Sequence, residues 1–334
     1  MSNTSEIQEA AALLQAGELV AFPTETVYGL GADAANPLAV QKIFTAKGRP
    51  SDHPLIVHLS DAEGLARWAM EIPPVAYRLA EKFWPGPLTL ILKKQAWVPT
   101  AVTGGQDTVG LRMPAHPLAL QLIRAFAALP ERRGGVAAPS ANRFGRVSPT
   151  TATHVQEELG GRVARILDGG ACQVGIESTI LDLSRLATHG AEILRPGGLD
   201  PLSLAEVLGE MPRLRDGANQ DNAPRVSGSL LSHYAPTTPL QLVDGAALAG
   251  FLRQQSRAGR RCGVLAHSPQ TLQTAEATAR IAMPADPSGY AHRLYAALRE
   301  LDAQNLDLMV VETPPATLIW NAVCDRLRRA TAPK

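Results

Sequence analysis

The segment Phe22–Gly31 is the first stretch whose residue types could carry chemistry. It places Thr24, Glu25, Thr26 and Tyr28 directly after a short apolar run, and two glycines follow. Ligands of α/β sheets bind at strand ends, and glycine lets a backbone approach a ligand closely. Proline, threonine and glycine are also ordinary turn residues, so this pattern alone supports a turn and a binding site equally.

The glycines of this segment also resemble a dinucleotide-binding fingerprint, Gly29-x-Gly31-x-x-Ala34. That fingerprint must open its helix, so that a pyrophosphate meets the helix N-terminus. Here asparagine followed by proline, Asn36-Pro37, predicts that the next helix begins only at Pro37. An oxidoreductase is therefore the least favoured function.

Cations and histidines follow that predicted helix. Lys47 and Arg49 flank a glycine, and two cations on one turn can each neutralise a different phosphoryl oxygen. Lysine and glycine also commonly end helices, which is the structural alternative. His53 follows closely, and His58 lies inside the apolar run Pro54–Leu59, where an imidazole needs a polar partner.

Polar residues also recur along later predicted strands. Thr108–Met113 alternates with a period of two, so Thr108, Gly110 and Arg112 share one face. An arginine beside a hydroxyl can bind a carboxylate through two hydrogen bonds. Small polar residues follow other strands, in Ala138-Pro-Ser140-Ala-Asn142, Ser148-Pro-Thr, Glu177-Ser178-Thr and Arg195-Pro-Gly.

The elements that must position these residues alternate between short helices and short apolar strands over residues 1–200. This rhythm predicts an α/β catalytic domain with a twisted mixed sheet of about seven strands. The predicted strands are Leu19–Phe22, Pro54–Leu59, Leu88–Leu92, Thr108–Met113, Gly135–Ala138, Arg165–Leu167, Thr179–Leu183 and Ile193–Arg195.

Residues 201–238 read as a long linker, because the stretch Met211–Ser232 is rich in Pro, Gly, Asn, Asp and Ser and loses apolar periodicity. From Pro239 the pattern returns to strand, helix, strand, with strands at Leu240–Val243, Cys262–His267 and Leu306–Glu312. This predicts a smaller Rossmann-like α/β domain over residues 239–334.

Composition narrows the class of protein. Apolar residues make up 45%, charged residues 19%, and the net charge is +1, which does not indicate a strongly basic nucleic-acid binder. The three cysteines lie far apart, which suits a reducing compartment. No segment reaches the roughly 20 apolar residues of a membrane span. A cytoplasmic protein without a membrane partner is expected.

Taken together, the segments resemble the YrdC family. The matching elements keep one order along the chain, FPTETVYGLG, KGRP, PLIVH, TVGLRMP, APSAN, SPT, ESTI and LRPG. They span about Gly17 to Gly198, and their shared order is far more specific than any one motif. The linker motif Ser232-His-Tyr234-Ala-Pro and the small second domain are similar to the long, two-domain threonylcarbamoyl-AMP synthases.

The resemblance implies that L-threonine, bicarbonate and ATP react to L-threonylcarbamoyladenylate and pyrophosphate, a nucleotidyl transfer that begins the N6-threonylcarbamoyladenosine modification of tRNA. Mg²⁺ would arrive on the ATP phosphates, with no metal held by the protein alone. tRNA or a downstream threonylcarbamoyl transferase is a possible partner.

The resemblance also assigns the residues. Lys47 and Arg49 would supply catalytic charge. Threonine would be held by Thr26, His58, Arg112, Ala138 and Ser178. ATP would be contacted by Arg49, His53, Thr108, Ser140, Asn142, Ser148, Arg195 and Tyr234. A nucleotide-binding tyrosine inside a linker further suggests that Met211–Pro236 folds over the site as a lid.

Two features depart from the family pattern. His53 stands where the family has an asparagine, and Ser227–Leu231 replaces the Pro-Gly-Met and basic residues that precede the linker motif. Two other functions stay open as alternatives. One is a double-stranded RNA or tRNA-binding module without catalysis. The other is a carbamoyl-transfer domain of the hydrogenase-maturation type, which is disfavoured because its zinc-finger cysteines are missing.

Overall fold

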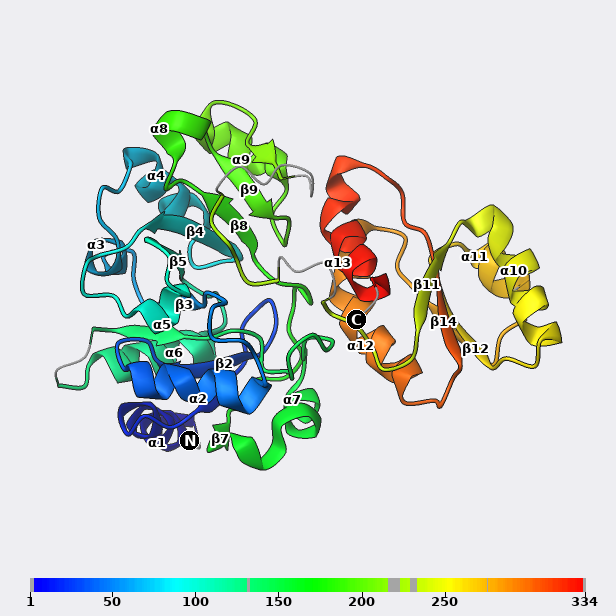
Figure 1. Ribbon diagram of the computed structural model, residues 1–334, viewed down its shortest axis with the longest axis horizontal. Coiled ribbons are helices and arrows are strands. Elements are labelled where there is room, and N and C mark those ends of the chain that lie inside the picture. Colours follow the sequence, from blue (N-terminus) through cyan, green and yellow to red (C-terminus); the bar gives the residue numbers. More distant parts are fainter. Residues whose placement is uncertain (1–2, 131–132, 216–222, 229–232, 275, 333–334) are drawn as a thin grey trace. The chain divides into compact units, whose positions relative to one another are not determined.

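The chain folds into two compact units, each with its own sheet (Figure 1). The computed structural model describes residues 3–130, 133–215, 223–228, 233–274 and 276–332. The first unit comprises Met1–Phe144, Pro149–Gln173 and Glu177–Ser229, and the second comprises Gly145–Ser148, Val174–Ile176 and Leu230–Lys334.

The first unit holds a mixed sheet in the order β10-β9-β8-β4-β5-β3-β6-β2-β1-β7. The predicted mixed α/β sheet is confirmed, but the described residues form ten strands in it where about seven were expected. The strands are β1 (Val20–Phe22), β2 (Gly29–Asp33), β3 (Ile56–Leu59), β4 (Leu88–Lys93), β5 (Thr108–Arg112), β6 (Gly135–Ala137), β7 (Arg165–Ile166), β8 (Thr179–Asp182), β9 (Glu192–Arg195) and β10 (Arg213–Leu214).

Strand β2 is absent from the predicted strands. The segment with Gly29 and Gly31 was interpreted as a turn or a binding site, yet the two glycines belong to a strand that pairs with β1. A Cβ atom on Gly31 would lie 2.8 Å from the ring of Phe22 and 3.0 Å from the Val136 side chain. Glycine is therefore required at Gly31 by close packing inside the sheet.

The helices of the first unit follow the expected start and stop signals where these are strong. In α2 (Pro37–Lys47) the side chain of Asn36 accepts the amides of Leu38 and Ala39, and Gly48 ends the helix in the left-handed conformation. The other helices are α1 (Asn3–Gln15), α3 (Gly64–Trp68), α4 (Pro74–Phe83), α5 (Thr100–Thr103), α6 (Pro117–Ala127), α7 (Ala152–Leu159), α8 (Leu186–His189) and α9 (Pro201–Leu208).

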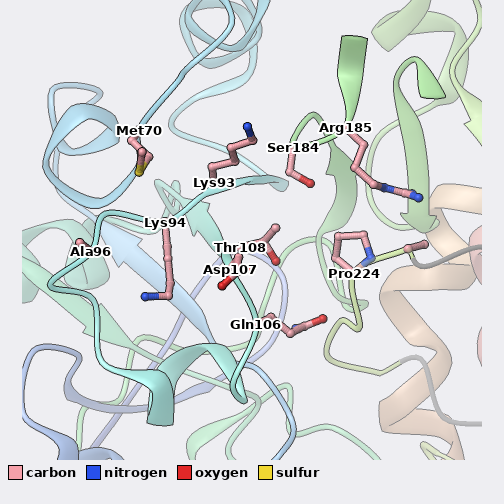
Figure 2. A pocket seen from close by; sticks show the side chains of 11 residues that line it. Met70, Lys93, Lys94, Ala96, Gln106, Asp107, Thr108, Ser184, Arg185 and Pro224 are labelled. Atoms are coloured by element: carbon pink, nitrogen blue, oxygen red, sulfur yellow. The ribbon is translucent and has the colours of Figure 1, made fainter. Parts of the chain in front are cut away.

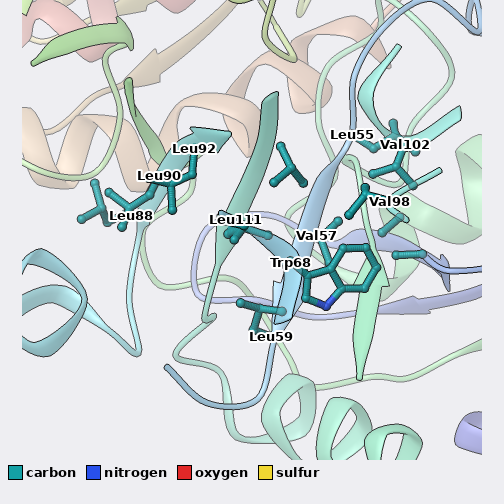
Figure 3. Packing of buried hydrophobic residues seen from close by; sticks show 14 of the residues in the cluster. Leu55, Val57, Leu59, Trp68, Leu88, Leu90, Leu92, Val98, Val102 and Leu111 are labelled. Atoms are coloured by element: carbon teal, nitrogen blue, oxygen red, sulfur yellow. The ribbon is translucent and has the colours of Figure 1, made fainter. Parts of the chain in front are cut away.

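One face of this sheet is filled by a large apolar core. Val57, Leu90 and Leu111 alternate inward from three neighbouring strands, and helices α2, α3 and α4 pack their apolar residues against them. Figure 3 shows the strand residues of this core around the indole of Trp68, which is completely buried. The core fixes which face each strand residue occupies.

The opposite face is covered over only part of its width. Helices α1 and α6 pack on Val20, Phe22 and Val136, at the side of the sheet that β1 and β6 form. Toward β5, β4 and β8 the same face carries polar side chains and a small apolar cluster. The candidate site lies on this part of the sheet.

The predicted linker 201–238 begins with a short helix, α9, as its apolar residues Leu202–Leu208 predict. Strand β10, which was not predicted, adds to the edge of the sheet beside β9. Residues 223–228, called the strap from here on, group with the first unit. The rest of the linker and lid prediction, at 216–222 and 229–232, lies outside the described residues.

The second unit is a small parallel α/β domain, and its sheet runs in the order β11-β14-β12-β13. Helices α10 and α11 lie on one side of the sheet, and α12 and α13 on the other (Figure 1). This follows from right-handed crossovers. The elements are β11 (Leu240–Val243), α10 (Gly245–Arg257), β12 (Cys262–Ala266), α11 (Pro269–Thr274), β13 (Ala279–Ala282), α12 (Pro287–Asp302), β14 (Leu308–Glu312) and α13 (Asn321–Thr331).

Among the described residues no helix combines the length and the hydropathy that a transmembrane span requires.

Glu312 joins the central strand of the second unit to the turn after β12. One carboxylate oxygen accepts the amides of His267 (2.8 Å) and Ser268 (2.9 Å), and the other accepts the Thr271 hydroxyl. Burial alone would raise the pKa of Glu312, but the hydrogen bonds from Ser268 and His267 outweigh it and lower the pKa. The ionised form therefore stabilises this unit.

Replacing Glu312 by glutamine should lower the free energy of unfolding by about 1–2 kcal/mol at pH 7, because charge-assisted hydrogen bonds are lost. The effect should fade below the ordinary carboxyl pKa, since a depressed pKa gives stability that is lost as the carboxyl becomes protonated. Denaturant unfolding at pH 7 and pH 3 measures this, with Glu300→Gln as an exposed control. An equal loss at both pH values would contradict the prediction.

Candidate active site

The candidate site is built on the open face of the central strands. Ile56 pairs with Gly110 and His58 with Arg112, so β3 and β5 present matching residues on one face. Thr89 and Ile91 of β4 join them, because Ile91 pairs with Gly110. As predicted, Thr108, Gly110 and Arg112 share one face of β5, and the strand register confirms this. We call the surface formed by these residues, Ile56, His58, Thr89, Ile91, Thr108, Gly110 and Arg112, the site face.

Arg112 is held at one end of the site face by a buried ion pair. Its Nη2 atom donates to Glu25 Oε1 at 2.6 Å, and its Nε atom donates to the carbonyl of Gly86 at 3.2 Å. The second oxygen of Glu25 accepts the amide of Ala115 at 2.9 Å. Within the part of the chain that the structure describes, Nη1 of Arg112 has no hydrogen-bond partner. This nitrogen can take a further anion.

Glu25 is a residue of the candidate site to which sequence reasoning assigned no role. It was noticed as a carboxylate in Phe22–Gly31, but no role was assigned to it. The signal was available, because a carboxylate in an otherwise buried turn needs a cationic partner. Its exposure of 5% and its bond to Arg112 show that it fixes the plane of that guanidinium.

His58 is a neutral imidazole at the same end of the site face. Burial and the positive charge of Arg112 lower the pKa of His58 to about 3, and the backbone of Ile56 and Val136 opposes this only in part. No described group completes a hydrogen bond to its buried Nδ1 atom. A neutral ring with unused hydrogen-bonding capacity suits a polar ligand.

Ser178 connects the β4 and β9 sides of the site. Its hydroxyl lies 2.8 Å from the Thr89 hydroxyl and accepts from Arg195 Nη2 at 3.1 Å. Arg195 also donates to the Ser178 carbonyl through Nε and Nη2. Thr89 was missed by sequence reasoning, which recorded its strand only as a run of apolar residues. Its position on the site face of β4 places the hydroxyl here.

Arg49 and Arg195 both reach the strap. Arg49 Nη2 donates to the Ser227 hydroxyl at 3.1 Å, and Arg195 Nη1 donates to the Ser227 carbonyl at 2.9 Å. Next to Ser227, the side chain of Val226 packs into an apolar cluster with Ile180 and its neighbours on the site face. Two predicted nucleotide-binding cations thus converge on oxygen atoms of one residue.

Lys47 lies close to these cations but is directed elsewhere. Its ammonium group donates to the carbonyl oxygens of Ser140 and Asn142. Burial, followed by the charge of Arg49, lowers the pKa of Lys47 well below its ordinary value. Through these hydrogen bonds, Lys47 stabilises the turn that carries Ser140 and Asn142. Its predicted catalytic role is neither shown nor contradicted.

Thr26 and Ala138 border the site from the other side. The Thr26 hydroxyl lies 2.7 Å from that of Thr24, which also donates to the Val27 carbonyl and so closes the turn. The amide of Ala138 donates to the Ile56 carbonyl at 3.0 Å, which ties it to the start of β3. Both residues are buried beside the site face.

His53 and Thr108 lie at the other end of the site. The His53 ring meets the edge of Phe144 at 5.5 Å, and burial, helped by Arg49, lowers the pKa of His53. Thr108 lines a cavity of about 690 Å³, shown in Figure 2, that opens beside the strap at Pro224. The cations there are Lys93, Lys94 and Arg185, and the volume is that of a small-molecule site.

Ser148 and Tyr234 belong to the second unit. Tyr234 stacks on Tyr295 at 5.8 Å, and the guanidinium of Arg326 lies 5.1 Å from its ring centre. Its φ of 61° is unusual for a bulky aromatic residue. Such conformations persist only where the surroundings enforce them and are common at functional sites.

Comparison with known proteins agrees with this arrangement. Residues 12–197 match the model of the Sua5/YciO/YrdC family, described as telomere recombination. Residues 201–332 match a second model, described as the C-terminal domain of threonylcarbamoyl-AMP synthase.

Curated relatives match nearly the whole chain. The threonylcarbamoyl-AMP synthase of Bacillus subtilis is 42% identical over 98% of this chain and 94% of its own length. That of Pyrococcus abyssi is 40% identical with the same coverage.

A solved structure agrees with the sequence relatives. The crystal structure of P. abyssi Sua5 complexed with L-threonine superposes with a TM-score of 0.88 at 40% identity, covering 97% of this chain and 94% of that one. The chain belongs to the Sua5/YciO/YrdC family, and within it to the two-domain threonylcarbamoyl-AMP synthases.

Proposed function

We propose that this chain converts L-threonine, bicarbonate and ATP into L-threonylcarbamoyladenylate and pyrophosphate. The observation that carries the proposal is Arg112, a buried guanidinium that is oriented by Glu25 and keeps Nη1 unpaired among the described residues. Such a group suits the carboxylate of an amino acid. The relative crystallised with L-threonine supports this choice of substrate.

The reaction requires positioning and charge stabilisation, and no protein nucleophile. The amine of threonine adds to CO₂ formed from bicarbonate and loses a proton, which gives a carbamate. A carbamate oxygen attacks the α-phosphorus of ATP, the bond to pyrophosphate breaks, and a mixed anhydride remains. Holding both reactants in line and neutralising the leaving group supply the catalysis.

The two ends of the site face divide these tasks. Thr26, His58, Arg112, Ala138 and Ser178 form the threonine end. The neutral ring of His58 can accept or donate a hydrogen bond without adding charge, and the Ser178 hydroxyl is held in place by Thr89.

The nucleotide end of the first unit is formed by Arg49, His53, Thr108, Ser140, Asn142 and Arg195, and the nucleotide contacts of Ser148 and Tyr234 stay predictions from the resemblance. Arg49 and Arg195 already share the oxygens of Ser227, and phosphoryl oxygens can take the same two guanidinium groups. Lys47 supports this end by fastening the turn at Ser140.

The strap is one described part of the predicted lid, Met211–Pro236. Gln106 clamps it, because its side chain accepts the Arg225 amide at 2.6 Å and donates to the Arg225 carbonyl at 3.1 Å. Ser227 accepts hydrogen bonds from Arg49 and Arg195, the two cations that would bind the phosphates. The strap therefore moves when nucleotide binds, and it covers the nucleotide once bound.

We also propose how Mg²⁺, a threonylcarbamoyl transferase and tRNA take part. Mg²⁺ arrives on the phosphates of ATP. The adenylate passes, in the cytoplasm, to a threonylcarbamoyl transferase that modifies adenosine in tRNA. Because the mixed anhydride is reactive, its prompt consumption by the transferase is favourable.

Pyrophosphate release should require L-threonine, bicarbonate and ATP together, because the carbamate is the nucleophile. A coupled phosphate assay that omits each reactant in turn measures this, and mass spectrometry should find the adenylate. Release that continues at the same rate without threonine would overturn the proposed function.

Replacing Thr89 by valine should raise the KM for threonine about three- to tenfold, because Ser178 loses a hydrogen bond worth about 1 kcal/mol. Steady-state kinetics with threonine as the varied substrate measures it. Thr188→Val, at an exposed hydroxyl, is the control. An unchanged KM would show that Thr89 does not position Ser178.

Threonine binding should show no titration of His58 between pH 5.5 and 7.5. A pKa lowered from 6.5 to about 3 leaves the ring neutral over this whole range, so its contribution fades only on acidification toward pH 3. Calorimetric titration with L-threonine at several pH values measures it. A tenfold loss of affinity per pH unit below pH 6.5 would contradict the neutral imidazole.

A further inference from the structure

Gly110 is a glycine that the backbone conformation of its strand does not require. It lies inside β5, and its φ is not in the left-handed region that favours glycine. The three atoms nearest to a Cβ atom there would be side-chain carbons: Ile91 Cδ1 at 3.2 Å, which would have to shift slightly, and carbons of Ile56 and Thr89 at 3.5 Å. Gly135 and Gly197 differ, since a Cβ atom would lie 2.4 Å from Trp68 and 2.3 Å from the Thr179 backbone nitrogen.

A glycine inside a strand weakens the strand and often marks a point where a ligand or another backbone approaches closely. In this structure the strap lies over Gly110. The pocket between the strap and the site face, to whose lining Gly110 and Val226 both belong, measures about 10 Å³, at the lower limit for one water molecule. Two explanations follow: the missing side chain makes room for the strap, or for a ligand that lies under it.

The position of Gly110 along β5 favours a ligand. Residues at intervals of two share a face, so Gly110 lies between Thr108 and Arg112. Under the proposed function, on which this inference rests, Arg112 binds the threonine carboxylate and Thr108 contacts the nucleotide. The carbamoyl group and the α-phosphorus join those two ends and therefore lie over Gly110.

We propose that Gly110 is a specificity-determining residue: its missing side chain lets the carbamoyl-phosphate linkage rest against the backbone of β5. Each half of the product is bound by residues at one end of the site face. Only the joined molecule, L-threonylcarbamoyladenylate, needs the space over Gly110.

The test is Gly110→Ala, which adds one methyl group where the neighbours are flexible. Threonine binding, measured by calorimetry, should stay within about twofold of wild type and also reports that the variant is folded. Pyrophosphate release at saturating substrates should fall between about 10- and 100-fold, the usual effect of overpacking. Gly161→Ala, which meets nothing within 4 Å, is the matched control and should behave as wild type.

A double-mutant cycle with Val226→Ala separates the two explanations. If Gly110 serves the ligand, the rate penalty of Gly110→Ala persists in the Val226→Ala background. If it serves the strap, the penalty disappears there, and the proposal is overturned. Loss of threonine binding in Gly110→Ala would overturn it as well.

Failure of this inference and failure of the proposed function give different results. A wild-type protein that releases no pyrophosphate from the three reactants refutes the function. A wild type that is active and a Gly110→Ala variant that equals it refute only the role of Gly110.

Discussion

The ion pair between Glu25 and Arg112 holds the threonine end of the site together. Both side chains are almost completely buried, at 6% and 5% exposure, and a buried pair is tolerated only when further hydrogen bonds complete it. The Gly86 carbonyl and the Ala115 amide do so. The ion pair thereby joins the turn after β1, the turn before β4 and the segment after β5, which are distant in sequence.

Alternation along the strands explains what could be predicted from the sequence. The period of two placed Thr108, Gly110 and Arg112 on one face, and the structure has them there because the large core fixes the other face. The same rule could not reveal the partner of Arg112. Glu25 lies in a turn, where no periodicity relates a residue to a strand that pairs elsewhere in the sheet.

The segments that escaped prediction owe their structure to distant contacts. Gly29–Asp33 reads as a loop because glycines weaken a strand, yet pairing with β1 and β6 makes it one. Lys47 reads as a free cation at a helix end, and only the fold brings the carbonyls of Ser140 and Asn142 to it. The strap reads as linker because Val226 is its only large apolar side chain. The apolar partners of Val226 come from four different strands.

The central claim is that Arg112 recognises the carboxylate of threonine, and a comparison of two ligands tests it most directly. Calorimetry would compare L-threonine with L-threoninamide on wild type and on Glu25→Gln/Arg112→Gln, a double variant that leaves no unpaired buried charge. The account predicts that wild type binds L-threonine about 30-fold more tightly than L-threoninamide, because a charged hydrogen bond contributes about 2 kcal/mol. The double variant should bind L-threonine less than about threefold more tightly than L-threoninamide. A variant that keeps the wild-type preference would contradict the account.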